Sequence, residues 1–171
     1  MTKLNKYMSD SYQDFFDNNL ENKFDLCISV ETLEHLENKY SENFISSLCS
    51  LSNNIIFSCA YIGQGGVNHL NENLHSNWAF IFKKYDFYPF DIFRPIVWNN
   101  DKISYWYRQN TFLYLKKNSP SFDYMIKKMP YIKNFSFMDC IHPKMYEKKI
   151  SKGVKETFKD LLIKLKKKFI K

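Results

Sequence analysis

The stretch from residue 24 to residue 37, which reads FDLCISVETLEHLE, constrains the fold more than any other part of the chain. Its first seven residues are mostly apolar, and so short an apolar run is typical of a strand buried on both faces, as in parallel sheets. Polar side chains crowd together directly after the carboxyl end of this predicted strand: Glu31, Glu34, His35 and Glu37. Because open α/β sheets bind ligands at the carboxyl ends of their strands, these residues are candidates for a site. An acidic helix start, which the helix dipole favours, is the alternative interpretation.

The next segments alternate between helix and strand. A helix is predicted to begin near Ser41, which can cap it, and to bury a stripe of Phe44, Ile45, Leu48 and Leu51. The apolar run at 55–60 predicts a second buried strand, so that the three segments form a right-handed βαβ unit. A further helix is predicted at 77–87, with a core stripe of Trp78, Ile81, Phe82 and Tyr85.

Two more strands are predicted at 90–97 and 111–116, as an antiparallel pair that ends the sheet. Pro95 interrupts the first of them, which places this proline at a strand end or on an edge. The segment between the two strands would open at the ligand end, and it carries Trp98, Trp106 and Arg108. Aromatic rings beside an arginine suit a sugar or a planar substrate, although simple packing would also explain them.

A glycine-containing loop at 61–75 leaves the carboxyl end of the second predicted strand. It carries three of the four glycines of the chain, together with His69, Asn71, Glu72 and His75. It lacks the lysine and the Ser/Thr of a P-loop, so phosphate binding is not expected. We expect its polar side chains to enter the same crevice as those that follow residue 30, although glycines also serve loops that simply need positive φ.

The motifs, taken together, resemble class I S-adenosylmethionine-dependent methyltransferases. Residues 25–36, DLCISVETLEHL, are similar to the fourth strand and the following turn of that superfamily. Four later motifs look like one bacterial branch of it, some members of which accompany surface-polysaccharide genes: GQGG at 63–66, HLNE at 69–72, RPIVW at 94–98 and WYRQN at 106–110. The resemblance covers roughly residues 12–117 and implies methyl transfer to a small-molecule or carbohydrate acceptor.

The resemblance also implies roles for individual residues. Glu31 would lie beside the S-adenosylmethionine cofactor, and Asp14 would contact its adenine amine. His69 is the candidate general base, because the ordinary pKa of histidine is close to neutral pH, and Glu72 would orient it. Trp98, Trp106 and Arg108 would bind substrate.

One part of the family pattern is not found. The glycine-rich loop that cradles the methionine part of the cofactor should precede Phe24, yet none of the 23 residues before it is glycine. We therefore expect a truncated methyltransferase-like α/β domain at 1–117, a partial Rossmann-like sheet of about four strands, and weak binding of S-adenosylmethionine at best.

The alternatives are a non-enzymatic remnant, one subunit of a two-chain assembly, or a module that binds anionic surfaces. With its neighbour missing, the edge at 24–30 would favour self-association or a second chain.

The remainder, 118–171, is expected to be an extension that ends in a basic helix at 151–171. The formal net charge is +7, and residues 144–171 hold eleven lysines against three acidic residues. We expect the apolar stripe of the helix to dock on the domain: Val154, Phe158, Leu161, Leu162, Leu165 and Phe169. A membrane-surface role for this helix is the alternative, and we expect no nucleic-acid partner.

The four cysteines, at positions 27, 49, 59 and 140, show no spacing typical of zinc ligands, so we predict no metal site from the sequence. The first twenty residues are too polar for a signal peptide, and no apolar run approaches the length of a membrane span. These features favour the reducing cytoplasm.

Overall fold

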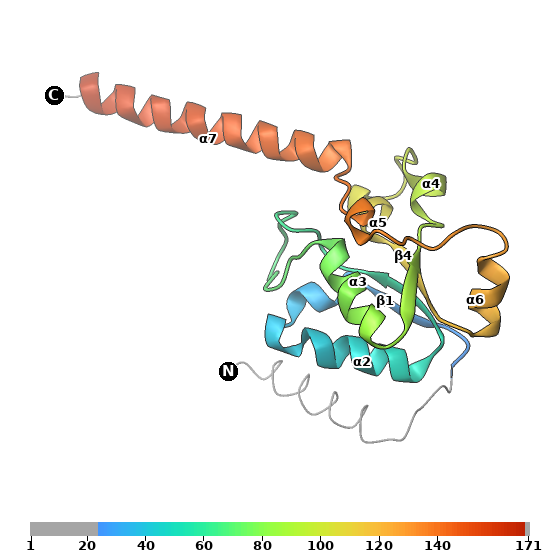
Figure 1. Ribbon diagram of the computed structural model, residues 1–171. Helices are drawn as coiled ribbons and strands as arrows, with labels where there is room; N and C mark the ends of the chain where they lie inside the picture. The colour runs from blue at the N-terminus through green and yellow to red at the C-terminus, as the bar shows by residue number, and fades with distance from the viewer. Residues whose placement is uncertain (1–23, 170–171) are drawn as a thin grey trace.

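The computed structural model describes residues 24–169, with side chains up to Thr157 and at Lys159, and it has a mixed α/β architecture (Figure 1). Its four-stranded open sheet has the order β1-β2-β4-β3. The strands are β1 (Cys27–Val30), β2 (Asn54–Ser58), β3 (Phe87–Phe90) and β4 (Phe112–Lys116). β1 and β2 are parallel, and β4 is antiparallel to both β2 and β3. The predicted class, the βαβ unit and the antiparallel final pair are confirmed.

One face of the sheet is covered by α2 (Ser41–Leu51) and α3 (His75–Lys84). The α2 stripe is buried as predicted, and from α3 the side chains of Trp78 and Phe82 enter the same core. Phe82 stacks on Tyr114 of β4 with ring centroids 4.0 Å apart. Burial of each large apolar side chain stabilises the fold by roughly 1.5–3 kcal/mol, so this layer is the main core.

The opposite face is covered only in part by the described residues. α6 (Pro120–Met125) packs Phe122 against Phe90, Leu113 and Leu115, which lie on β3 and β4. At the other end of the sheet, Ile28 of β1 is 62 % exposed and Leu26 is also exposed. The prediction that the first strand is buried on both faces is therefore wrong, because α6 extends over β4 and β3 rather than over β1.

The predicted strand at 90–97 is also wrong in its position. The strand is β3, three residues earlier, and residues 94–97 form the short helix α4 (Arg94–Val97). Pro95 lies in the first turn of α4, where a backbone N–H is not needed. Pro89 lies inside β3, which pairs only with β4 among the described strands and so tolerates a missing donor on its other side.

Ser41 is the first residue of α2 rather than its N-terminal cap. Its side chain makes no capping hydrogen bond, and its Oγ instead accepts a hydrogen bond from Asn71 Nδ2 at 2.8 Å. The predicted cap is thus replaced by a tertiary contact that fastens the glycine-containing loop to the start of α2.

The remaining elements are short except for the last. They are η1 (Leu33–His35), η2 (Asn38–Tyr40), α5 (Tyr105–Asn110), η3 (Phe135–Met138) and α7 (Pro143–Phe169). α7 begins eight residues before the predicted helix and extends away from the sheet (Figure 1). In the part of the chain that the structure describes, no helix has both the length and the apolar character needed to cross a bilayer.

The described part of α7 does not dock its apolar residues as predicted. Val154 is 64 % exposed, and every described side chain from 151 to 157 is exposed. The other members of the predicted stripe, Phe158, Leu161, Leu162, Leu165 and Phe169, lie outside the described side chains. The helix is fastened at its start instead, where Met145 is buried against Tyr61 and Tyr105.

Candidate functional site

Polar side chains gather where the parallel strands β1 and β2 end. Glu31, the first residue after β1, has φ 48°, the left-handed region that non-glycine residues seldom adopt. Its backbone N–H donates to the carbonyl and to the hydroxyl oxygen of Ser58, at 3.0 and 3.1 Å, so the end of β2 holds this turn in place. Strained backbone of this kind is often found at functional sites.

The carboxylate of Glu31 accepts hydrogen bonds from three elements. Ser58 Oγ and Asn110 Nδ2 donate to Oε1 at 2.8 and 3.1 Å, and Gln64 Nε2 donates to Oε2 at 3.1 Å. Asn110 Nδ2 also donates to Gln64 Oε1 at 2.8 Å. Because the antiparallel β4 begins where β2 ends, Asn110 at the end of α5 is brought to the same edge of the sheet. We call these four residues the Glu31 network.

A second layer holds Asn110 in position. Its Oδ1 accepts from Gln109 Nε2 at 3.0 Å and lies 3.1 Å from His75 Nε2. The other ring nitrogen of His75 lies 3.2 Å from the carbonyl oxygen of Met138. Burial lowers the pKa of His75 to about 4, so the ring is neutral at pH 7. His75 therefore supports the Glu31 network from the interior and does not face the solvent.

The glycine-containing loop brings His69 and Glu72 together, as the resemblance implies. Nδ1 of His69 lies 2.8 Å from Glu72 Oε1, which also accepts the backbone N–H of Gly65 at 2.6 Å. A Cβ at Gly66 would collide with Nε2 of His69, so the His69 ring can lie against this position only because the residue is glycine. His69 is thus oriented through one nitrogen and can use the other for chemistry.

Three residues beside the Glu31 network form a further cluster. Glu34, His35 and His69 each offer one donor atom, and these atoms all lie within 4.8 Å of one another. The rings of His35 and His69 meet edge to face, with centroids 5.1 Å apart. The carbonyl of Glu34 accepts the backbone N–H groups of Leu70 and Asn71, at 2.7 and 3.1 Å, which joins η1 to the loop.

Glu34 is a fully buried carboxylate, and neither oxygen has a hydrogen-bond partner of good geometry within residues 24–169. Its own backbone N–H and the Cys59 thiol compensate only in part. Desolvation raises the pKa of Glu34, and the nearby charge of Glu31 adds to the increase.

The predicted substrate residues lie on and before α5. Arg108 is buried, and its Nη1 donates to the Trp98 carbonyl oxygen at 2.9 Å and to Asp101 at 3.2 Å. Trp106 packs against Tyr105, and Trp98 against His142. These contacts bind α5 and the segment before it together, close in sequence to Asn110. Asp14, the predicted adenine contact, lies outside the described residues.

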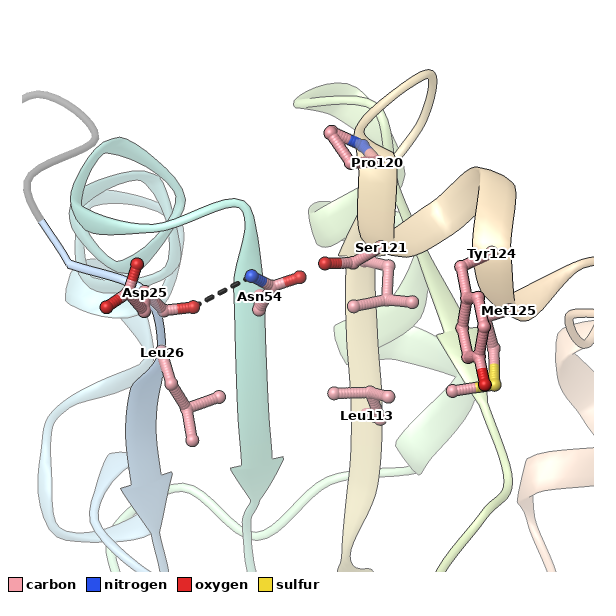
Figure 2. A pocket seen from close by; sticks show the side chains of 9 residues that line it. Asp25, Leu26, Asn54, Leu113, Pro120, Ser121, Tyr124 and Met125 are labelled. Carbon is pink, nitrogen blue, oxygen red and sulfur yellow. Dashed lines mark hydrogen bonds between the residues drawn. The ribbon is translucent and has the colours of Figure 1, made fainter.

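A shallow groove of about 520 Å³ lies at the opposite end of the sheet, between β1 and α6. Figure 2 shows β1 and β2 running away from Asp25 and Asn54, where Asn54 Nδ2 donates to the Asp25 carbonyl oxygen at 2.7 Å. The groove is therefore at the amino ends of the parallel strands and is separate from the Glu31 network.

No family model matches this chain. No curated protein and no solved structure matches it either.

Sequence reasoning missed three members of the Glu31 network, namely Ser58, Gln64 and Asn110. A signal for two of them was present, because Gln64 lies in the GQGG motif and Asn110 ends the WYRQN motif. Ser58 is the last residue of an apolar strand, and nothing in its local pattern distinguishes it from a core serine.

Proposed function

We propose that this chain forms the acceptor-side part of an S-adenosylmethionine-dependent methyltransferase, with the reaction at the carboxyl ends of β1 and β2. The observation that carries the proposal is the Glu31 network together with the adjacent His69–Glu72 pair. The motifs that support the family resemblance supply Glu31, Gln64, His69, Glu72 and Asn110, and these residues converge at the sheet edge where α/β folds bind ligands.

The order of the strands supports the proposal as well. The family resemblance implies that the last pair of strands is antiparallel, and β4 and β3 are paired in this way beside the parallel pair β1 and β2. Glu31 follows β1, which is the position at which the resemblance implies an acidic residue beside the cofactor. None of residues 1–23 is glycine, so the glycine-rich cradle for the methionine part of the cofactor would come from a second polypeptide or from sequence beyond these 171 residues.

In methyl transfer the protein itself supplies only a base and the positioning of the reactants. When bound, S-adenosylmethionine would supply the methyl group, which would pass to a lone pair of the acceptor oxygen or nitrogen as the S–C bond broke and its electron pair stayed on sulfur. The acceptor loses one proton, which Nε2 of His69 takes up while Glu72 holds Nδ1. The main contribution is the positioning of the two reactants.

The test is methyl transfer by the protein purified, with an affinity tag, from cells that naturally contain it, so that a second polypeptide remains bound. S-adenosylmethionine with a labelled methyl group is supplied together with the small-molecule and glycan fractions of those cells. We expect labelled product with the wild type and about 10²-fold or more slower transfer with His69→Ala. Glu42→Gln, which alters an exposed carboxylate paired with Lys84, is the control. Absence of labelled product with the wild type would refute the proposal.

A second function is favoured by α7 alone. Its described side chains combine exposed lysines with exposed apolar residues, among them Tyr146, Ile150 and Val154. A helix with such a surface binds anionic membranes through both charge and apolar contact. This function would localise the protein and is compatible with methyl transfer.

A further inference from the structure

We propose that Glu34, His35 and His69 form a binding site for a divalent transition-metal ion of the Zn²⁺ type. Their donor atoms already lie within 4.8 Å of one another. Two imidazoles and one carboxylate are the ligands of a common zinc site that keeps a position open for water or substrate. The ligands come from η1 and from the glycine-containing loop, and His69 follows the other two ligands by more than 30 positions in the sequence.

Both histidines have the outer contacts that metal-binding histidines need. Nδ1 of His35 lies 3.3 Å from the carbonyl oxygen of Asn68, and Nδ1 of His69 lies 2.8 Å from Glu72 Oε1. A backbone carbonyl or a carboxylate on one ring nitrogen fixes the ring and leaves the other nitrogen as a ligand. We therefore assign Nε2 of each ring as the ligand atom.

The buried carboxylate of Glu34 supports the metal site independently of the distances between the ligand atoms. A buried carboxylate whose oxygens have no hydrogen bond of good geometry is costly, since burial removes its hydration and little replaces it. A bound cation would supply the missing partner. The backbone bonds from Leu70 and Asn71 to the Glu34 carbonyl hold this carboxylate beside the loop that carries His69.

The distances indicate how the site would close. Ligand bonds of about 2.0–2.2 Å in a tetrahedral site place the ligand atoms roughly 3.4 Å from one another. The three donors, now within 4.8 Å of one another, must therefore approach by up to roughly 1.4 Å on binding. His35 is exposed and can rotate, whereas Glu34 is fixed by burial. Mg²⁺ and Ca²⁺ prefer all-oxygen sites and fit this ligand set poorly.

This metal site does not rest on the proposed methyl transfer. An ion on Nε2 of His69 would occupy the atom that the methyltransferase proposal uses as a base, so the two roles exclude one another on the same molecule. Metal binding is measured without cofactor or acceptor, and its failure would leave the methyl-transfer assay as a separate question.

The test is calorimetric titration of the metal-free, full-length protein with ZnCl₂, repeated with CoCl₂ and followed by the visible absorption of Co²⁺. We expect one Zn²⁺ per chain in the wild type. His69→Ala and Glu34→Gln should abolish this binding, because each removes a ligand. Two gentler variants keep all three ligands. Glu72→Gln should weaken Zn²⁺ binding about 10–100-fold by loosening His69, and Gly66→Ala should weaken it because the added Cβ collides with Nε2.

Two control variants test whether side chains outside the proposed site bind the ion. Cys140→Ser removes an exposed thiol and Glu42→Gln an exposed carboxylate, and neither should change the Zn²⁺ affinity. Thermal melting without metal shows whether each variant folds. Failure of the wild type to bind Zn²⁺ would overturn the proposal, as would unchanged binding in the folded Glu72→Gln and Gly66→Ala variants or equal binding in His69→Ala. Saturable Co²⁺ absorption that Gly66→Ala weakens would support it.

Discussion

Asn110 is the residue on which the buried polar contacts depend most. It donates to Glu31 and to Gln64, and it accepts from Gln109, while its own side chain is almost completely buried. An amide is needed here because only a side chain with both a donor and an acceptor can serve these partners at once.

Replacement of Asn110 by alanine should destabilise the fold by about 3 kcal/mol. The substitution leaves several buried polar groups without a partner, each at a cost of roughly 1–3 kcal/mol. The measurement is urea unfolding at pH 7. Asn43→Ala, at an exposed position of α2, is the matched control and should shift the free energy of unfolding by less than about 0.5 kcal/mol. Equal stability of the two variants would show that the contacts of Asn110 are unimportant.

His75 should make the stability of the protein depend on pH. Burial and the nearby charge of Arg94 lower its pKa to about 4, against the attraction of Asp139, the Met138 carbonyl and Asn110. The unfolded chain binds a proton on this ring below about pH 6.5 while the folded chain does not. The contribution of His75 is therefore fully present above pH 6.5 and is lost as the pH falls toward 4.

The wild type should consequently lose roughly 2–3 kcal/mol more than His75→Gln between pH 7 and pH 4.5. Denaturant unfolding at the two pH values gives this difference directly, because the carboxylates that titrate in the same range are common to both proteins. Parallel pH profiles would mean that the His75 ring is protonated in the folded state.

At the scale of single residues, the sequence indicated which polar side chains belong to the site, but it predicted few of the contacts that they make. Glu31, His69 and Glu72 were predicted as neighbours because they follow consecutive parallel strands, and the last two are in contact. Glu34, His35 and His69 were expected in one crevice, but the burial of Glu34 could not be predicted, since the rotation of η1 after the strained residue Glu31 decides that Glu34 points inward and His35 outward.

At the scale of elements, apolar patterns predicted α2, α3, β2 and β4 well, because α2 and α3 each bury one regular face and β4 is buried on both of its faces. The errors lie where tertiary contacts override the local pattern. Residues 94–97 are apolar enough for a strand, but the Arg94 side chain binds Asp91 and the Met138 carbonyl, which fixes a helical turn instead. β1 has the apolar composition of a buried strand, although its neighbours among the described residues cover it on one face only.

The projecting part of α7 should contribute little to stability and should bind anionic membranes. Deletion of residues 151–171 should leave the melting temperature nearly unchanged, because the described side chains from 151 to 157 are exposed while the Met145 anchor is retained. The deletion should also abolish binding to vesicles that contain anionic lipid, and in the full-length protein high salt should weaken that binding. Differential scanning calorimetry and vesicle sedimentation are the measurements. A large fall in melting temperature would show that the basic helix docks on the domain.

At the scale of the whole molecule, β1 is an edge strand within the described sheet, with Ile28 exposed on it and Leu26 exposed directly before it. Exposed apolar edges pair with other chains, and charged side chains on the edge oppose such pairing. We expect the purified chain to self-associate at about 100 μM in size-exclusion chromatography with light scattering. The variant Ile28→Lys should shift it toward the monomer. A wild type that stays monomeric and melts sharply at this concentration would refute the exposed-edge interpretation.

The central claim, that the carboxyl ends of β1 and β2 form the cofactor and acceptor site, is tested most directly by titrating ¹⁵N-labelled protein with S-adenosylmethionine in the presence of a metal chelator. The account predicts weak binding, with amide shifts concentrated at Glu31, Gln64 and Asn110. Shifts confined to the groove between Asp25 and Tyr124 at the opposite end of the sheet, or no shifts at millimolar ligand, would contradict it.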